Sequence, residues 1–336
     1  MQHKRSLSSL LVTGGAGFIG SAFIRYLLSN EDFTGKILNL DSLTYAANWN
    51  NLKDFHDHPR YQFLQGDIRN QTLIEKVCSE HKIDTIVHFA AETHVDRSIS
   101  SAYPFIETNV VGTLSLLEVT RKSPSIHFHH ISTDEVYGSL GERGFFNEHS
   151  PYRPNSPYSA SKAASDHLVR SFANTYGLST TLSHCSNNFG PGQNPEKFIP
   201  LMISHCLESR PLPIYGQGNN IRDWLYVDDH VEAIEKILLF GKKGETYDIG
   251  ADSEFSNIKL LHLLIDLLSQ ELKTDPSIYL NLIQFISDRP GHDFRYAIDS
   301  SKIKQELHWH PKTSIEEGLM KTIKWYINSI PLLTRD

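Results

Sequence analysis

Two adjacent carboxylic acids follow an apolar run near the middle of the chain. Asp134 and Glu135 lie in the stretch STDEVYG at 132–138, directly after residues 126–131. Neighbouring carboxyl groups in a partly desolvated pocket drive their pKa values apart, so one stays protonated while the other is ionised. Such a pair can act as the acid and the base of an elimination. Taken alone, the stretch leaves open the alternative of a solvated pair on a loop.

A tyrosine and a lysine at helical spacing form a second chemical pair. Tyr158 and Lys162 belong to the stretch YSASK, so on a helix their side chains share one face. We expect the lysine ammonium and a positively charged nicotinamide to lower the pKa of the phenol from its usual value of about 10. The phenolate can then take the proton of a hydroxyl group, and Thr133 is expected to bond the same oxygen. The alternative is a solvated helix face, against which Ser132-Thr133 and the glycine loop argue.

A glycine loop near the N-terminus is typical of a binding site for a nicotinamide dinucleotide. The stretch TGGAGFIG at 13–20 stands between a short apolar strand and a helix expected over 21–29, where loop amides and a helix N-terminus face a pyrophosphate. Gly14 permits the tight turn, Gly17 lets the backbone approach the phosphates, and Gly20 lets the helix pack on the strand. Asp41 ends a second strand at 36–40, where a carboxylate holds ribose hydroxyls and repels a 2′-phosphate, so NAD is favoured over NADP. A glycine-rich turn without a ligand is the alternative.

Two further strand ends add to the expected cofactor site. Asp67 follows a strand at 61–65 and can bond an adenine amino group, cap the helix that begins near residue 71, or do both. Ala90 and Ala91 follow a strand at 85–89 and leave room for a cofactor to pass. We interpret His94, just beyond them, as a hydrogen-bonding scaffold rather than a catalytic group.

Composition bounds the class of protein. The 336 residues are 39% hydrophobic and 21% charged with a net charge of −7, which is typical of a globular protein and argues against nucleic acid as a partner. Cys78, Cys185 and Cys206 match neither a disulfide framework nor a zinc spacing, so we expect no metal and a reducing, cytoplasmic location. Residues 7–12 run straight into the glycine loop and are expected to form a strand, not a signal peptide. No apolar run approaches the roughly 20 residues of a membrane span.

Strands and helices alternate through the first half of the chain. This pattern predicts an α/β fold of Rossmann type, a doubly wound parallel sheet with helices on both faces. Beyond it prolines interrupt the chain, and helices at 231–240 and 260–272 alternate with short strands, which indicates a smaller mixed α/β lobe. We expect residues 1–186 to form the NAD-binding domain, with some later segments returning to it, and residues 187–336 to form mainly the nucleotide-sugar-binding lobe. Exposed apolar stripes on helices at 105–120 and 158–176 would suit a subunit contact.

These motifs resemble the extended short-chain dehydrogenase/reductase family, and within it the dTDP-glucose 4,6-dehydratases. The resemblance runs from about residue 10 to residue 326, and the Asp-Glu pair is its most specific feature, because the 4-epimerases of the family lack it there. It is carried by TGGAGFIG, LDSLTYAAN, FAAETHVDRS, STDEVYG, YSASK, SNNFGP, PEKFIPL, YGQGNNIRDWLYVDDH and DRPGHDFRYAID.

The resemblance implies a hydro-lyase of deoxysugar biosynthesis, as in the dTDP-rhamnose pathway. The implied reaction oxidises C4 of dTDP-glucose, eliminates water across C5 and C6, and returns the hydride to C6 from tightly bound NAD. Tyr158 would take the O4 proton, Glu135 the C5 proton, and Asp134 would protonate the departing C6 hydroxyl. The resemblance also implies a homodimer built on the two helices at 105–120 and 158–176.

The resemblance assigns further residues to each role. The catalytic set is Thr133, Asp134, Glu135, Tyr158 and Lys162. The cofactor set is Gly14, Gly17, Phe18, Ile19, Gly20, Asp41, Leu43, Thr44, Asp67, Ile68, Phe89, Ala90, Ala91, Thr93, Thr108, Tyr158, Lys162 and Asn187. The substrate set is Thr93, Thr133, Asn187, Asn188, Lys197, Arg222, Asn257, His292, Asp293 and Tyr296.

Some positions and readings stay open. Arg222 is the leading diphosphate ligand, because its planar fork suits phosphate oxygens, but it could instead pair with Asp223. Departures from the family pattern are Ala47 for a glycine, His184 for an arginine, Phe189 for a tyrosine and Phe294 for an arginine. The rival functions are a UDP- or CDP-sugar 4,6-dehydratase, an NAD-dependent 4-epimerase and a non-catalytic NAD-binding protein.

Overall fold

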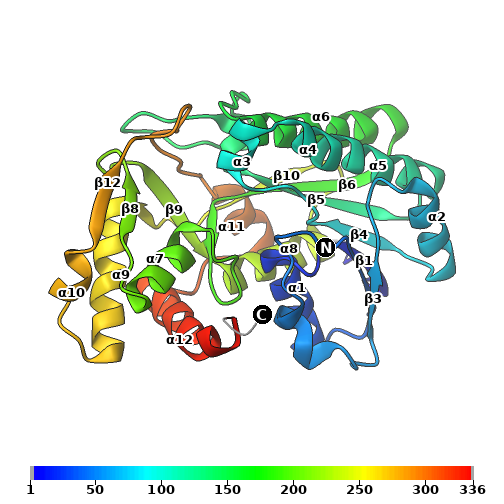
Figure 1. Ribbon diagram of the computed structural model, residues 1–336. Helices are drawn as coiled ribbons and strands as arrows, with labels where there is room; N and C mark the ends of the chain where they lie inside the picture. The colour runs from blue at the N-terminus through cyan, green and yellow to red at the C-terminus, as the bar shows by residue number, and fades with distance from the viewer. Residues whose placement is uncertain (1–3, 334–336) are drawn as a thin grey trace.

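A seven-stranded, wholly parallel sheet forms the centre of the computed structural model, which describes residues 4–333 (Figure 1). Its strand order is β10-β6-β5-β4-β1-β2-β3. The strands are β1 (Ser9–Thr13), β2 (Lys36–Asp41), β3 (Tyr61–Gln65), β4 (Thr85–His88), β5 (His127–Thr133), β6 (Ser179–Cys185) and β10 (Thr246–Ile249). The predicted doubly wound α/β fold is confirmed.

Helices cover both faces of this sheet, because side chains alternate between the faces along each strand. Leu10 and Val12 of β1 pack with α1 and α8, whereas Leu11 between them packs with α2, α5 and α6. The helices of these layers are α1 (Phe18–Ser29), α2 (Gln71–Glu80), α5 (Thr113–Lys122), α6 (Pro157–Tyr176), α8 (Val227–Phe240) and α11 (Ser301–Leu307). Helix α6 begins at a capping box in which Ser156 and Ser159 bond each other's backbone.

A smaller group of elements lies beyond the β10 side of the sheet (Figure 1). A three-stranded sheet has the order β11-β9-β7, and β8 pairs with β12. The elements are β7 (Asn187–Phe189), β8 (Leu212–Tyr215), β9 (Ile221–Tyr226), β11 (Glu254–Ser256), β12 (Ile283–Ile286), α7 (Phe198–Leu207), α9 (Asn257–Leu272), α10 (Ser277–Leu280) and α12 (Ile315–Leu333). They share an apolar core centred on Trp224, Leu261 and Leu264.

The helix predicted over 105–120 is present as an unbroken helical run, but it contains a π-helical segment. The chain forms α3 (Val95–Ser100), α4 (Tyr103–Phe105), a π-helical segment η2 (Ile106–Gly112) and then α5. Within η2, the Asn109 amide bonds Glu92 through both backbone groups, at 2.9 Å to N and 3.1 Å to O, and Ser161 Oγ at 2.8 Å. The wider π-helical turn therefore holds residues 90–92, which follow β4, against α6. Such turns often occur at functional sites.

Candidate active site

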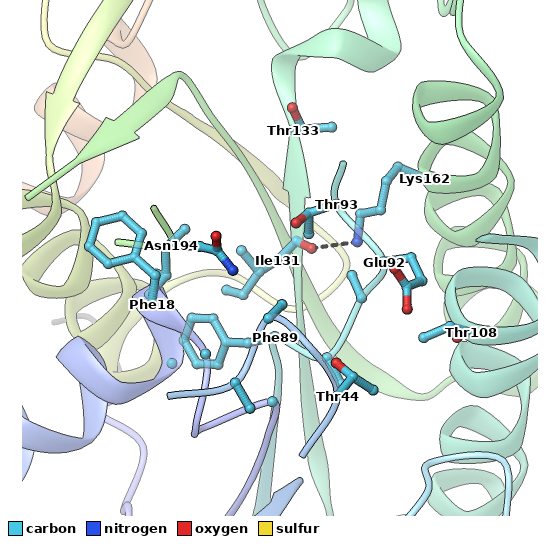
Figure 2. A pocket seen from close by; sticks show the side chains of 18 of the residues that line it. Phe18, Thr44, Phe89, Glu92, Thr93, Thr108, Ile131, Thr133, Lys162 and Asn194 are labelled. Carbon is cyan, nitrogen blue, oxygen red and sulfur yellow. Dashed lines mark hydrogen bonds between the residues drawn. The ribbon is translucent and has the colours of Figure 1, made fainter. Parts of the chain in front are cut away.

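A cavity of about 530 Å³ opens at the carboxyl ends of the parallel strands. It lies beside β1 and β4, where the strand order reverses and where open α/β sheets bind their ligands. Figure 2 shows Phe18, Thr44 and Phe89 on one side of this cavity and Thr133 and Lys162 on another. One chamber thus joins the glycine loop to the residues expected to do chemistry.

The structure brings nearly all of the predicted cofactor residues to this cavity. Leu43 is the exception: its side chain is exposed, and its backbone N–H donates to Asp41 Oδ1 at 2.8 Å. The lining includes Gly14, Gly17, Phe18, Ile19, Gly20, Asp41, Thr44, Asp67, Ile68, Phe89, Ala90, Ala91, Thr93, Thr108, Tyr158, Lys162 and Asn187.

The glycine loop is packed too tightly for side chains. Gly14 has a φ of +72°, and a Cβ there would lie 2.5 Å from the Ala90 backbone nitrogen. A Cβ at Gly20 would lie 2.4 Å from the Gly14 carbonyl oxygen. Asp41 Oδ2 accepts the Ala16 N–H at 2.9 Å, which fixes the carboxylate at the edge of the loop. Burial raises the pKa of Asp41, and two backbone hydrogen bonds oppose that rise.

Asp134 and Glu135 differ in their surroundings although they are neighbours. They form a single turn, η3 (Asp134–Tyr137), directly after β5. Burial and the Glu135 charge raise the pKa of Asp134 well above its usual value. Burial also raises the pKa of Glu135, but the positive charges of Arg289, Arg222 and Lys197 lower it. The surroundings therefore favour the protonated form more at Asp134 than at Glu135.

The expected effect of Lys162 on Tyr158 is wrong. Burial and then the Glu135 charge raise the pKa of Tyr158 well above its usual value, while a hydrogen bond with Thr133 lowers it. Lys162 Nζ instead donates to the Ile131 carbonyl at 2.8 Å, as Figure 2 shows, and lies 3.4 Å from His130 Nε2. Burial lowers the pKa of Lys162 to about 8. Thr133 thus lies within hydrogen-bonding reach of the Tyr158 hydroxyl, and its predicted bond to the same substrate oxygen stays a prediction.

The predicted substrate residues fall into two groups. Thr93, Thr133, Asn187, Asn188 and Lys197 line the cavity. The remaining residues, Arg222, Asn257, His292, Asp293 and Tyr296, do not line it.

Most of this second group forms one cluster. Arg222 Nη2 donates to the Asp293 carbonyl at 2.9 Å, and the guanidinium lies 4.3 Å from the centre of the Tyr296 ring. Tyr296 OH donates to Asp293 Oδ2 at 2.6 Å. The Asn257 N–H donates to the Asn220 carbonyl at 3.0 Å. The cluster is buried, and its Arg222 guanidinium suits an anionic group, while Asp293 adds a carboxylate beside it.

Two alternatives left open by the sequence are decided by these contacts. Asp223 accepts the backbone N–H groups of Ala251 and Ser253 at 2.8 and 2.7 Å, so the alternative of an ion pair with Arg222 is wrong. His94 Nδ1 caps α3 by accepting the Arg97 N–H at 3.4 Å, which agrees with the scaffold interpretation.

Sequence reasoning missed several residues of the site. Arg289 lies close enough to lower the pKa of Glu135 and forms an ion pair with Asp96 at 3.1 Å. Arg289 lies in the stretch DRPGHDFRYAID, which could have marked it, but the predicted substrate residues of this stretch all lie within 292–296. Gln193, Asn194 and Cys185 also line the cavity. No local motif marked Cys185 at the end of β6 or Gln193 and Asn194 in the segment after β7.

Two negative findings apply to residues 4–333. No helix in this range has both the length and the apolar character needed to cross a membrane. In the same range, no group of three or more His, Cys, Asp or Glu side chains is arranged to hold a metal ion. Cys78, Cys185 and Cys206 are free and buried.

Comparisons with known proteins agree with this geometry. The family model described as GDP-mannose 4,6 dehydratase matches residues 11–322. A dTDP-glucose 4,6-dehydratase of Neisseria gonorrhoeae is 49% identical over 334 residues, covering 96% of each chain.

Solved structures show the same relationship. The dTDP-glucose 4,6-dehydratase of Bacillus anthracis in complex with NAD has a TM-score of 0.88 at 45% identity, over 96% of this chain and 98% of that one. A UDP-glucose 4-epimerase of Thermotoga maritima with UDP-glucose has a TM-score of 0.85 at 28% identity, over 96% and 99%. The chain therefore belongs to the extended short-chain dehydrogenase/reductase family, and within it to the dTDP-glucose 4,6-dehydratase group.

Proposed function

We propose that this protein is a dTDP-glucose 4,6-dehydratase, which converts dTDP-glucose to dTDP-4-keto-6-deoxyglucose and water. The observation that carries the proposal is the buried Asp134–Glu135 turn on the same cavity as Tyr158. The pKa of Asp134 is raised well above its usual value there, whereas positive charges oppose the rise at Glu135. An elimination needs such an acid and base side by side, and a simple oxidation does not.

The residues of the cavity fit NAD. The close backbone approaches at Gly14 and Gly20 leave room for a pyrophosphate, and Asp41 stands where ribose hydroxyls are held. The side-chain oxygen of Asn187 is buried without a hydrogen-bond partner among the described residues, and Asn187 lines the cavity. Bound NAD supplies the acceptor for the C4 hydride and the donor that returns it to C6.

Each catalytic side chain then moves a proton at a stated atom. Tyr158 takes the proton of the O4 hydroxyl, and the hydrogen bond with Thr133 favours its phenolate against the effect of burial. Glu135 takes the proton from C5, which the C4 ketone has made acidic. Asp134 gives its proton to the C6 hydroxyl, which leaves as water.

The cluster of Arg222, Asp293 and Tyr296 is proposed to hold the diphosphate, with Lys197 and Asn188 nearer the sugar. Arg222 is buried and directs its guanidinium nitrogens to backbone carbonyls, which fixes the orientation of its positive charge. His292 is proposed as a peripheral contact, since its Nδ1 lies 2.6 Å from Asp288 Oδ1. Asn257 is proposed to support this region from the start of α9.

Three broader assignments complete the proposal. Residues 1–186, joined by β10 and α8, form the NAD-binding domain, and residues 187–336 form mainly the nucleotide-sugar lobe. Two copies pair through α4, η2, α5 and α6, where Tyr103, Ile106, Val111, Leu114 and Tyr176 are exposed. The free, buried cysteines support a cytoplasmic location.

The test is incubation of the purified protein with dTDP-glucose and, separately, with UDP- and CDP-glucose, without added NAD. Product mass and alkali-induced absorbance are followed. Loss of water from dTDP-glucose alone supports the reaction, the donor and the retained cofactor. Loss of water from another donor keeps the mechanism and changes the substrate. Unchanged mass with galactose configuration supports a 4-epimerase, and no reaction even with NAD supplied contradicts an enzymatic role.

A further inference from the structure

One buried histidine lies where all the catalytic elements meet. His184 is 0% exposed and is the last residue but one of β6, directly before the cavity-lining Cys185. Its Nε2 lies 3.1 Å from Asp166 Oδ2, and its Nδ1 lies 2.8 Å from Asp248 Oδ1. Both carboxylates are fully buried. A ring between two carboxylates is best satisfied as an imidazolium, in which both nitrogens donate.

The first carboxylate belongs to the helix that carries Tyr158 and Lys162. Asp166 lies one turn after Lys162 on α6 and also accepts the Ser132 hydroxyl at 3.0 Å. Its other oxygen lies 3.3 Å from His130 Nε2, the nitrogen that Lys162 Nζ approaches. A change at His184 on this side therefore reaches the tyrosine–lysine pair.

The second carboxylate is tied to the turn that carries the acid and the base. Asp248 accepts the Tyr137 hydroxyl at 3.0 Å, and Tyr137 ends the η3 turn that begins with Asp134. Tyr137 OH also lies 2.9 Å from His184 Nδ1. A change on this side therefore reaches Asp134 and Glu135.

We propose that His184 is a positioning residue: as an imidazolium it holds Asp166 and Asp248 together, and so keeps α6 and the η3 turn in register around the cavity. The inference rests on the proposed function. His184 lies on β6 and Asp248 on β10, and β5 leads into η3. These three strands are neighbours in the sheet (Figure 1). Without the cation, two buried carboxylates would face each other unpaired, which strongly disfavours the closed arrangement.

The positive charge of the His184 ring follows from the side chains that surround it. Four oxygen-bearing side chains surround the ring: Asp166 on α6, Asp248 on β10, Tyr137 on η3 and Tyr152 on the loop between η3 and α6. Burial lowers the pKa of His184, but the hydrogen bonds to the two carboxylates outweigh it and raise the pKa to about 9.

Two variants separate the two halves of this arrangement. In His184→Asn the amide nitrogen replaces Nδ1, so the bond to Asp248 is kept and the bond to Asp166 is lost. In His184→Gln it replaces Nε2, so the opposite bond is kept. The matched control is His129→Gln. Within residues 4–333, the buried His129 of β5 has two hydrogen-bond partners, Thr181 at 2.8 Å and Ser183 at 3.2 Å.

Single-turnover absorbance of the reduced nicotinamide then distinguishes the variants. We expect His184→Asn to slow its appearance, because Tyr158 and Lys162 lose alignment, and His184→Gln to slow its decay, because Asp134 and Glu135 do. Each phase should slow by about 10- to 100-fold with KM for dTDP-glucose nearly unchanged, since small misplacements act on the reacting geometry. His129→Gln should keep both phases at the wild-type rate. Wild-type rates of both phases in both variants, or an equal slowing by the control His129→Gln, overturn the proposal.

A readout independent of turnover covers variants that fold poorly. In the NMR spectrum of the wild-type protein at pH 8, His184 should show both ring N–H groups, assigned by their absence in either variant. Asp248→Asn leaves the ring in place and should lower its pKa toward the usual value. A neutral His184 ring at pH 8 overturns the proposal even if activity falls. Failure of the wild-type protein to dehydrate dTDP-glucose would instead contradict the proposed function and leave the NMR result to decide the ion-pair arrangement.

Discussion

At the scale of single residues, the chemistry depends on two neighbouring carboxyl groups that meet different charges. Asp134 is 2% exposed, and its Oδ2 has no hydrogen-bond partner among the described residues. Glu135 lies within reach of the positive charges of Arg289, Arg222 and Lys197. These surroundings favour the protonated form of Asp134 more than that of Glu135.

Replacing the base should divide the reaction in two. We expect Glu135→Gln to retain C4 oxidation, which Tyr158 serves, and to lose elimination, so turnover falls by about 100- to 10,000-fold. Absorbance of the reduced nicotinamide should then accumulate on the enzyme when substrate is added. An activity near that of the wild type, or no accumulation, contradicts the assignment of Glu135.

Tyr158→Phe is the matched variant for the first step. It removes only the hydroxyl group, so we expect no reduced nicotinamide and a loss of turnover of similar size. Because burial and Glu135 raise the pKa of Tyr158, the rate of oxidation in the wild-type enzyme should rise with pH through the neutral range. Near-normal turnover by the variant contradicts the role of Tyr158, and a flat pH profile contradicts its titration.

Sequence reasoning found the residues whose signal is local. The glycine loop, the Asp134–Glu135 pair and the spacing of Tyr158 and Lys162 each lie within a few positions, and the strand at 61–65 has its predicted bounds. The links of His184 to Asp248 and of Arg289 to Asp96 join segments 64 and 193 positions apart, which no local pattern shows. The π-helical segment was not predicted. It occurs where Asn109 forms hydrogen bonds to residues distant in the sequence, and helix propensity does not indicate such bonds.

At the scale of elements, three segments meet at the mouth of the cavity. The Arg97 guanidinium lies 3.7 Å from the centre of the Tyr45 ring, and its Nη2 bonds Glu196 at 3.1 Å. Tyr45 OH donates to Glu92 at 3.3 Å. The loop after β2 is thereby joined to α3 and to the segment before α7, next to the cavity-lining residues Thr44 and Lys197.

We expect this contact to slow the escape of NAD. Tyr45→Ala removes the ring on which Arg97 stacks, a contact worth about 0.5–1 kcal/mol at an exposed site, so NAD should dissociate about two- to fivefold faster. The measurement is the NAD retained by purified protein after timed dilution. Phe285→Ala, which removes another half-exposed aromatic ring on β12, serves as the control and should retain NAD like the wild type. Equal retention by Tyr45→Ala and the wild type would show that the contact does not restrain the cofactor.

At the scale of the whole molecule, several buried histidines lie on the sheet strands β4 and β5 and on helix α8. Burial lowers the pKa of each of five: His88, His127, His129, His130 and His230. The pKa values of His127 and His130 fall to about 3 and about 4. Serine and threonine hydroxyls bond several of these rings, as Thr13 and Thr113 bond His88 at 2.7 and 3.0 Å, which satisfies those neutral rings inside the protein. His130 Nδ1 and His230 Nε2, in contrast, have no hydrogen-bond partner among the described residues.

These histidines predict a steep acid limit to stability. Their folded-state pKa values lie below the usual 6.5, so below that pH the unfolded chain binds more protons than the folded protein. The free energy of unfolding should therefore be fully present above pH 6.5 and fall as pH drops toward 4, by up to about 1.4 kcal/mol per pH unit for each histidine. Urea denaturation at fixed protein and NAD concentrations from pH 5 to 8 measures the slope. His127→Gln keeps a polar group between Ser179 and Thr181 and should reduce the slope by about one proton; an unchanged slope would show that His127 does not stay neutral in the fold.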